Sequence, residues 1–164
     1  MRRTAVLVSV VAVGLGLLLA RPDAARQASP DRTGWLWYKG NTHAHTTESD
    51  GDSSPEVVTR WYRDRGYQFL VLSDHNVLTN IEALSRTFAV PEQFLLVPGE
   101  EVTDAFGKAP LHINGLNVSR LVEPRHGTSV PDILQRNVDA IREARGVPHV
   151  NHPNFVWAIA PEHL

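Results

Sequence analysis

The chain of 164 residues contains no cysteine. This absence excludes disulfide frameworks, cysteine-based zinc fingers, iron–sulfur clusters and cysteine nucleophiles. Lysine is also scarce, with two lysines against 14 arginines, and no run of basic residues extends beyond Arg2–Arg3. With a net charge of −2, the chain lacks the basic stripe with interleaved aromatic residues that is typical of nucleic-acid binding. We therefore expect no nucleic-acid partner.

Internal repeats and low-complexity segments are absent as well, and the length suits a single domain. Hydrophobic residues make up 42% of the chain and charged residues 21%, a balance that argues against a disordered or fibrous protein. What the chain has in quantity is histidine, with eight in all. The positions of these side chains are the main guide to function.

The first 33 residues are predicted to lie outside the folded domain. Arg2 and Arg3 precede an uncharged run over residues 4–20, the pattern of a secretory signal peptide cleaved after Ala20. An uncleaved anchor is the alternative, although this run is at the short limit for crossing about 30 Å of hydrocarbon. Both interpretations predict an exported protein, periplasmic or secreted, that touches a membrane only through this segment if it is uncleaved. Residues 21–33 are interpreted as a linker, and residues 34–164 as the domain.

Strand and helix patterns alternate along residues 34–164. The aromatic residues near Trp35 predict a first strand that leads into a polar loop, and apolar runs predict strands over 67–72, 94–97, 111–118 and 147–152. Helices are predicted from Ser53 to Gly66, over 80–87 and over 131–145. This order favours a mostly parallel α/β architecture, either an open doubly wound sheet or a barrel. In both, the carboxyl ends of the strands carry the active site.

Five histidines are expected to meet at this edge of the sheet, accompanied by carboxylates. Burying several imidazoles and carboxylates together without a metal would cost several kcal/mol, and a divalent cation removes that cost. Nitrogen and oxygen ligands without thiolates suit Zn²⁺, Mn²⁺ or Fe²⁺. The histidines are His43, His45, His75, His112 and His152, and the carboxylates are Asp50, Asp74, Glu100 and Glu101.

The spacing of two histidines supports a shared metal ion, whereas three other histidines are not interpreted as ligands. Residues i and i+2 of a strand share a face, so His43 and His45 can bind one ion. Such a His-x-His pair is a weak motif by itself and gains weight from the other histidines. The remaining three are interpreted otherwise: His126 as a solvated loop residue, His149 as structural and His163 as terminal and uninformative.

Six segments resemble the ordered motifs of the PHP domain, the polymerase and histidinol phosphatase family of metallohydrolases. The segment Trp37-Tyr-Lys-Gly-Asn-Thr-His43 is similar to an exported branch of that family that includes carbaryl hydrolase-like enzymes. The six segments are Asn41-Thr-His-Ala-His45, Ser49-Asp-Gly51, Leu72-Ser-Asp-His-Asn76, Val97-Pro-Gly-Glu-Glu-Val-Thr103, Leu111-His-Ile-Asn-Gly115 and Val150-Asn-His-Pro153.

The resemblance implies a distorted (β/α)7 barrel and a set of site residues. Glu101 would be a catalytic carboxylate that bridges two ions, with Glu100 as the alternative, and Asp74 and Asn76 would orient an imidazole. The family also supplies a final Asp-x-His pair, which this sequence does not contain after His152, so an incomplete, C-terminally truncated domain is expected. The implied metal ligands are His43, His45, Asp50, His75, Glu101, His112 and His152.

The function implied by this resemblance is that of a metal-dependent hydrolase. Two or three divalent cations would activate a water, first of all against phosphoesters, with a small anionic ester as substrate. Hydrolysis of carbamates or carboxylic esters is an alternative within the same fold. A metal-binding fragment without activity is the alternative from a different functional class.

Overall fold

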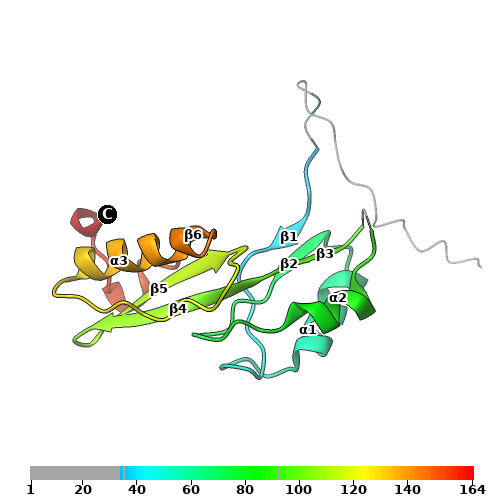
Figure 1. The fold of residues 1–164 in the computed structure, drawn as a ribbon, viewed down its shortest axis with the longest axis horizontal. Coiled ribbons are helices and arrows are strands. Elements are labelled where there is room, and N and C mark those ends of the chain that lie inside the picture. The colour runs from blue at the N-terminus through cyan, green and yellow to red at the C-terminus, as the bar shows by residue number, and fades with distance from the viewer. Residues whose placement is uncertain (1–33, 35, 92) are drawn as a thin grey trace, which may run out of the picture.

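The computed structural model describes residue 34 and residues 36–91 and 93–164. The predicted signal peptide and linker lie outside the described residues. No helix in the described part of the chain is long and apolar enough to cross a membrane. The elements, in chain order (Figure 1), are β1 (Gly40–Asn41), α1 (Pro55–Asp64), β2 (Phe69–Val71), α2 (Ile81–Phe88), β3 (Leu95–Val97), β4 (Gly99–Phe106), β5 (Ala109–Leu116), α3 (Val130–Glu143), β6 (Val147–Val150) and the short 3₁₀ helices η1 (Phe155–Trp157) and η2 (Pro161–His163).

The first half of the domain is a small parallel sheet in the order β1-β2-β3. Two helices pack on it: Leu84 and Phe88 of α2 are buried in a cluster with Leu70 and Leu72, and partly buried apolar side chains of α1 pack against this cluster. The start of α1 is fixed by Ser54, whose hydroxyl accepts a hydrogen bond from the backbone N–H of Val57. The strand-helix-strand order predicted for this half is confirmed.

The second half is an antiparallel sheet in the order β4-β5-β6. The prediction of a mostly parallel architecture is wrong here, because residues 99–106 form a strand of their own. Gly107 and Lys108 join this strand directly to β5, and so short a connection can only link antiparallel neighbours. Gly107 has φ +62°, a conformation that favours glycine. The glycine of this short connection was the local signal available in the sequence.

Helix α3 covers one face of the antiparallel sheet. It begins after Ser129, whose hydroxyl accepts from the backbone N–H of Asp132. Its buried residues Ile133 and Ile141 pack with Val102 and Ile113 of the sheet, and this cluster is the larger of the two cores. The opposite face of β4 and β5 is consequently left for polar side chains.

The two sheets meet through strands β3 and β4, which are separated by Pro98 alone and form one long green ribbon in Figure 1. Beyond β2, His75 forms a parallel bridge with Glu101 of β4. The backbone N–H of Glu101 donates to the carbonyl of Asp74, and that of Asn76 donates to the carbonyl of Glu101. Within the described residues the strands form these two small sheets and do not close into a barrel.

Candidate metal centre

The residues singled out in the sequence come together where the two sheets meet. His43 and His45 follow β1, and His75 follows β2, so these three lie at the carboxyl ends of parallel strands, as predicted. Glu101 and His112 instead lie within β4 and β5 and project from the face opposite α3. His152 follows β6, and Asp50 comes from the loop before α1.

Glu101 is at the centre of this cluster and is fully buried. One carboxylate oxygen, Oε2, lies 3.1 Å from Nε2 of both His43 and His45 and 3.4 Å from Nδ1 of His75. The other oxygen, Oε1, lies 3.3 Å from Nδ1 of His112 and 3.3 Å from Nε2 of His152. One carboxylate is thus in contact with all five histidines.

Asp50 closes the cluster on its solvent side. Its two oxygens lie 3.3 Å from Nδ1 of His45 and 3.5 Å from Nε2 of His75, and its side chain is 67% exposed. The buried Glu101 and the exposed Asp50 therefore lie on opposite sides of His45 and His75.

The arrangement fits divalent cations. Nε2 of His43 and Nε2 of His45 approach to 2.9 Å, and three residue groups each bring their ligand atoms within 4.8 Å of one another. Within the described residues, Nδ1 of His112 is buried without a hydrogen-bond partner. Nitrogen and oxygen donors of this kind suit Zn²⁺, Mn²⁺ or Fe²⁺. The three groups are His43–His45–Glu101, His45–Asp50–His75 and His75–Glu101–His112.

The pKa values in the cluster are shifted by burial and by mutual hydrogen bonds. Burial raises the pKa of Glu101, but its close contacts with neighbouring side chains, led by His112, outweigh burial and hold the pKa well below its usual range. The hydrogen bond with Glu101 raises the pKa of His45, against the effect of burial. Burial lowers the pKa of His75. The same buried carboxylate thus lies beside two imidazoles whose pKa values are shifted in opposite directions.

Asp74 was expected to orient an imidazole, and the structure gives it a different set of partners. Its fully buried carboxylate accepts hydrogen bonds from the backbone N–H and hydroxyl of Thr46, at 2.7 and 2.9 Å. It also accepts from the hydroxyls of Ser49, at 2.8 Å, and Thr79, at 2.6 Å. Ser49 in turn lies 3.4 Å from Nδ1 of His45. Asp74 therefore acts on the loop that carries His45 and Asp50, and reaches the imidazole through Ser49.

Two asparagines belong to the centre and were missed in the sequence. The side-chain amide of Asn151 donates to Oε1 of Glu101 and to Oδ1 of Asn114, both at 2.7 Å. Asn114 donates to the backbone carbonyl of Thr42, at 2.8 Å, just before the His43–His45 pair. Both asparagines are almost fully buried. Their signal was their position, since each lies within two residues of a histidine of the cluster.

The choice between the two adjacent glutamates is decided by the pleat of β4. Glu101 faces the cluster, whereas Glu100 points to the α3 side, where its Oε1 accepts from the backbone N–H of Val122 at 2.7 Å. Glu100 is fully buried, and its Oε2 has no hydrogen-bond partner among the described residues. Burial raises the pKa of Glu100 to about 7. Glu100 therefore has no direct part in the cluster.

Comparison with known proteins shows which folds are similar to this one and does not identify a substrate. No protein-family model matches the chain. Among curated proteins, the 5'-3' exoribonuclease Rnm of Salmonella typhimurium is 30% identical over 105 residues, which are 63% of this chain and 34% of that protein. The chain therefore spans about a third of the length of the curated relative it matches.

Two solved structures are also similar. A two-domain protein from Bacteroides vulgatus containing a predicted PHP-like metal-dependent phosphoesterase is 22% identical, with a TM-score of 0.55 over 77% of this chain and 40% of its own. An amidohydrolase from Chromobacterium violaceum, with bound sulfate and no metal, is 28% identical, with a TM-score of 0.44 over 52% of this chain and 30% of its own. The mixed α/β fold of this chain is thus similar to that of a PHP-like protein.

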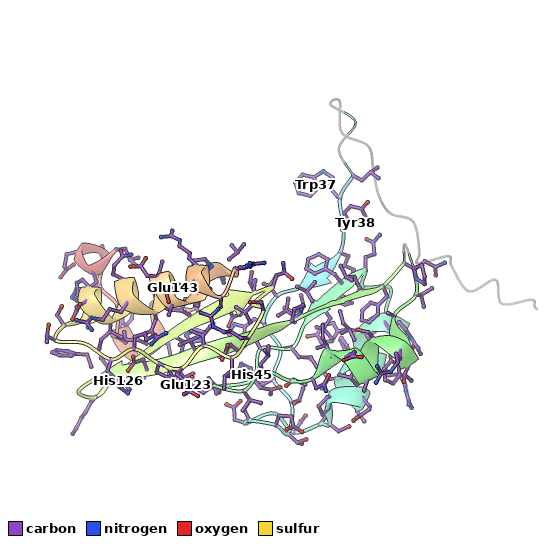
Figure 2. The ribbon with its side chains drawn as sticks, in the orientation of Figure 1. Trp37, Tyr38, His45, Glu123, His126 and Glu143 are labelled. Atoms are coloured by element: carbon purple, nitrogen blue, oxygen red, sulfur yellow. The ribbon has the colours of Figure 1, made fainter. Side chains whose placement is uncertain are left out.

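The remaining histidines lie outside the cluster. The side chain of His126 is 80% exposed, and its Nδ1 contacts Oδ1 of Asp104 at 2.7 Å. Figure 2 shows His126 well separated from His45. Nδ1 of His149 pairs with the Oδ1 of Asn151, at 3.1 Å, and Nδ1 of His163 accepts from the backbone N–H of Ala160. The side chain of His126 is solvated as predicted, but it also has a hydrogen-bond partner, Asp104, that the prediction did not include.

Proposed function

We propose that this chain is a metal-dependent hydrolase of the PHP type. The observation that carries the proposal is Glu101, a buried carboxylate whose two oxygens contact His43, His45 and His75 on one side and His112 and His152 on the other. Two or three divalent cations bound here would activate a water and stabilise charge that develops on the substrate. The similarity in fold to a protein that contains a predicted PHP-like metal-dependent phosphoesterase supports this proposal.

The chain's own residues would have separate roles in this reaction. Glu101 would bridge the cations, and the amide of Asn151 holds its Oε1 in place. Asp50, on the solvent side, would complete the part of the centre nearest the substrate. Asp74 would maintain the loop that presents His45 and Asp50. These roles make Glu101 the residue on which the whole centre depends.

We propose phosphoesters as the substrate class, in the form of a small anionic ester. A hollow of about 320 Å³ opens beside His45, between the loop at Asp52–Ser53 and the apolar side chains of Val57 and Trp61 on α1. Its position next to the centre suits the organic part of an ester, while cations in the centre would bind the anionic part. Carbamates and carboxylic esters are the alternative substrates, and they would use the same activated water.

The decisive test compares two adjacent glutamates. Glu101→Gln keeps the size of the side chain but removes its charge, so we expect loss of metal binding and at least a 100-fold loss of metal-dependent turnover, on the order of the loss expected for a single essential charged group. Glu100→Gln is the matched control, because its carboxylate faces α3, and it should retain both properties. Metal content measured by mass spectrometry and turnover of bis-p-nitrophenyl phosphate and 1-naphthyl carbamate, with added Mn²⁺ or Zn²⁺, provide the readouts.

The outcomes separate the candidate functions. Metal-dependent turnover of the phosphodiester that is lost in Glu101→Gln supports the proposal, and turnover of the carbamate alone would replace phosphoesters by the alternative class. Metal binding that depends on Glu101, with no turnover of either probe, would mean an inactive metal-binding module. A short single-stranded RNA should be added as a third probe, because the curated relative is named as an exoribonuclease. Its cleavage would overturn our expectation of no nucleic-acid partner.

We also propose that the protein is exported, on the basis of residues 1–20 alone, and that it belongs to the exported branch suggested by the segment before His43. Export predicts that the protein fractionates with the periplasm or the medium, with an N-terminus at residue 21 if the segment is cleaved. Fractionation with the membrane and an intact N-terminus would support the anchor instead.

A further inference from the structure

We propose that Thr103 is a positioning residue that fixes the tautomer of His75, so that His75 presents Nε2 to a cation beside Asp50. This inference rests on the proposed metal centre and concerns a residue that contributes no metal ligand itself. Thr103 lies on β4, two residues after Glu101 and on the same face. Its hydroxyl is 2.5 Å from Nδ1 of His75.

The surroundings of the two imidazole nitrogens differ, and this difference assigns the proton. Nδ1 of His75 faces two acceptors, the Thr103 hydroxyl and the buried Oε2 of Glu101 at 3.4 Å. The Thr103 hydroxyl has a single hydrogen, and it donates to the backbone carbonyl of Glu101 at 3.1 Å, which leaves its lone pairs for Nδ1–H. Nε2 faces Asp50, at 3.5 Å, whose side chain is mostly exposed. The proton therefore belongs on Nδ1 and the lone pair on Nε2.

The backbone of Thr103 is held independently of its hydroxyl. Asn76, at φ +52°, accepts from the backbone N–H of Thr103 through Oδ1, at 2.8 Å. The amide of Asn76 donates to the backbone carbonyl of Thr103, at 3.1 Å. These two bonds use only backbone atoms of Thr103, so they attach the segment after His75 to β4 regardless of the side chain at position 103. A change confined to the Thr103 hydroxyl can therefore alter the imidazole without moving the strand.

The assignment has a consequence for the site that His75 serves. His75 belongs to two of the ligand groups, one with His45 and Asp50 and one with Glu101 and His112. With Nδ1 occupied by a proton and directed at Thr103, only Nε2 is free to bind, and Nε2 is the nitrogen that faces Asp50. His75 therefore serves the cation at the Asp50 side, which is the side exposed to solvent.

The first test reads the tautomer directly in the metal-free, full-length protein. Long-range ¹H–¹⁵N spectra of the imidazoles, with His75 assigned by its loss in His75→Gln, should show the proton on Nδ1 in the wild type. Thr103→Val retains the shape and the backbone bonds but removes the acceptor, and should shift His75 towards the other tautomer. Thr103→Ser restores a hydroxyl and should restore the wild-type spectrum. Thr87→Val is the control, because its hydroxyl donates only to the carbonyl of Ala83 in α2.

The second test measures metal affinity by calorimetric titration with Zn²⁺. Loss of a partner that orients a ligating histidine typically costs 10- to 100-fold in affinity, so Thr103→Val should weaken one binding event by about this factor. Thr103→Ser and Thr87→Val should bind like the wild type.

A proton on Nε2 in the wild type, or the same His75 spectrum in Thr103→Val and wild type, would overturn the inference. Failure of Thr103→Ser to restore the spectrum would also overturn it. The spectra need neither metal nor turnover, so a protein that fails as a hydrolase still tests the role of Thr103.

Discussion

The two sheets contribute to the metal centre in different ways. The parallel sheet delivers His43, His45 and His75 on the segments that follow its strands, whereas the antiparallel sheet delivers Glu101 and His112 from within its strands. Residues within paired strands are positioned by the hydrogen bonds of the ladder, and β4 and β5 are in register over eight residue pairs. Residues in loops have no such ladder, so other side chains must hold them.

On the parallel side these side chains include Asn76, Asn114 and the buried carboxylate of Asp74. Asp74 binds Thr46, Ser49 and Thr79, and thereby ties the loop after β1 to the segment after β2. The antiparallel side contains a counterpart, since the almost fully buried Asp104 binds the backbone N–H of His126 and the amide of Asn137. Asp104, however, projects from the α3 face of β4, away from the cluster. The two aspartates are alike in burial and bonding but differ in what they hold.

The largest expected effect comes from exchanging these aspartates for alanine one at a time. Asp74→Ala leaves buried hydroxyl and N–H groups without an acceptor, and should lower the free energy of unfolding by about 4 kcal/mol. It should also weaken Zn²⁺ binding at least about 10-fold, because the loop carrying His45 and Asp50 loses its support. Chemical denaturation and calorimetric titration measure the two quantities.

Asp104→Ala is the matched variant for the other sheet. It should cost a similar free energy of unfolding, about 3 kcal/mol, because it frees the amide of Asn137 and the loop at His126. Its affinity for Zn²⁺ should remain at the wild-type value. Equal losses of Zn²⁺ affinity in the two variants would show that the distinction between loop-borne and strand-borne ligands is unfounded.

A second prediction concerns the pH dependence of the free energy of unfolding. Glu100, in the antiparallel sheet, contributes to it. Its pKa is about 7 in the folded chain, against an ordinary value of 4.5. Between these values the folded chain keeps a proton that the unfolded chain has lost, so this group's contribution to stability is complete below the unfolded pKa and is lost as the pH rises through the folded pKa. In the presence of a chelator, Glu100→Gln should remove a fall of about 3 kcal/mol in the free energy of unfolding between about pH 5 and pH 8. Parallel pH profiles of wild type and variant would refute this.

The smallest expected effect is at the hairpin that joins β4 to β5. Gly107 has φ +62° and a Cβ added there would meet no neighbour, so Gly107→Ala should cost only the backbone strain, about 1 kcal/mol. Lys108→Ala, at the exposed next position, should change the free energy of unfolding by less than about 0.5 kcal/mol. Zn²⁺ affinity should be unchanged in both, since the long ladder keeps Glu101 and His112 in register. A loss of affinity in Gly107→Ala would mean that the turn, rather than the ladder, sets that register.

Sequence patterns predicted the parallel half of the fold better than the antiparallel half. The apolar run over residues 67–72 is a local signal and corresponds to β2. The predicted helix start at Ser53 is also a local signal, and the structure places the cap one residue later, at Ser54. The strand β4 was missed because Glu100, Glu101 and Asp104 make residues 99–106 polar, and polar residues after an apolar run are typical of a strand that has ended. Those side chains are buried because each faces partners far away in the sequence, which no local pattern records.

The difference between local signals and contacts that are distant in the sequence also applies to the site. Five of the histidines and Asp50 were recognisable because imidazoles are rare and their spacing is informative. The structure brings these five histidines to Glu101. Asp50 contacts two of them, His45 and His75, on the far side from Glu101. The partners Asn114, Asn151 and Thr103 were not recognised as part of the site, because asparagine and threonine are common in strands and loops for other reasons. Their importance comes from the precise approach of their polar atoms to Glu101 and His75, which depends on the register of strands that the sequence alone does not fix.

The central position of Glu101 in the chain has a consequence for how the protein matures. Its contacts reach back 58 residues to His43 and forward 50 residues to Asn151. A ribosome must therefore release the chain as far as His152 before all the described partners of this carboxylate are available, and contacts of such long sequence separation form slowly. Until then, only the neighbouring His43 and His45 offer a cation a local pair of ligands. Tight metal uptake should thus follow the synthesis of residues 151 and 152, and arrest of translation before Asn151 should leave a nascent chain that holds metal weakly.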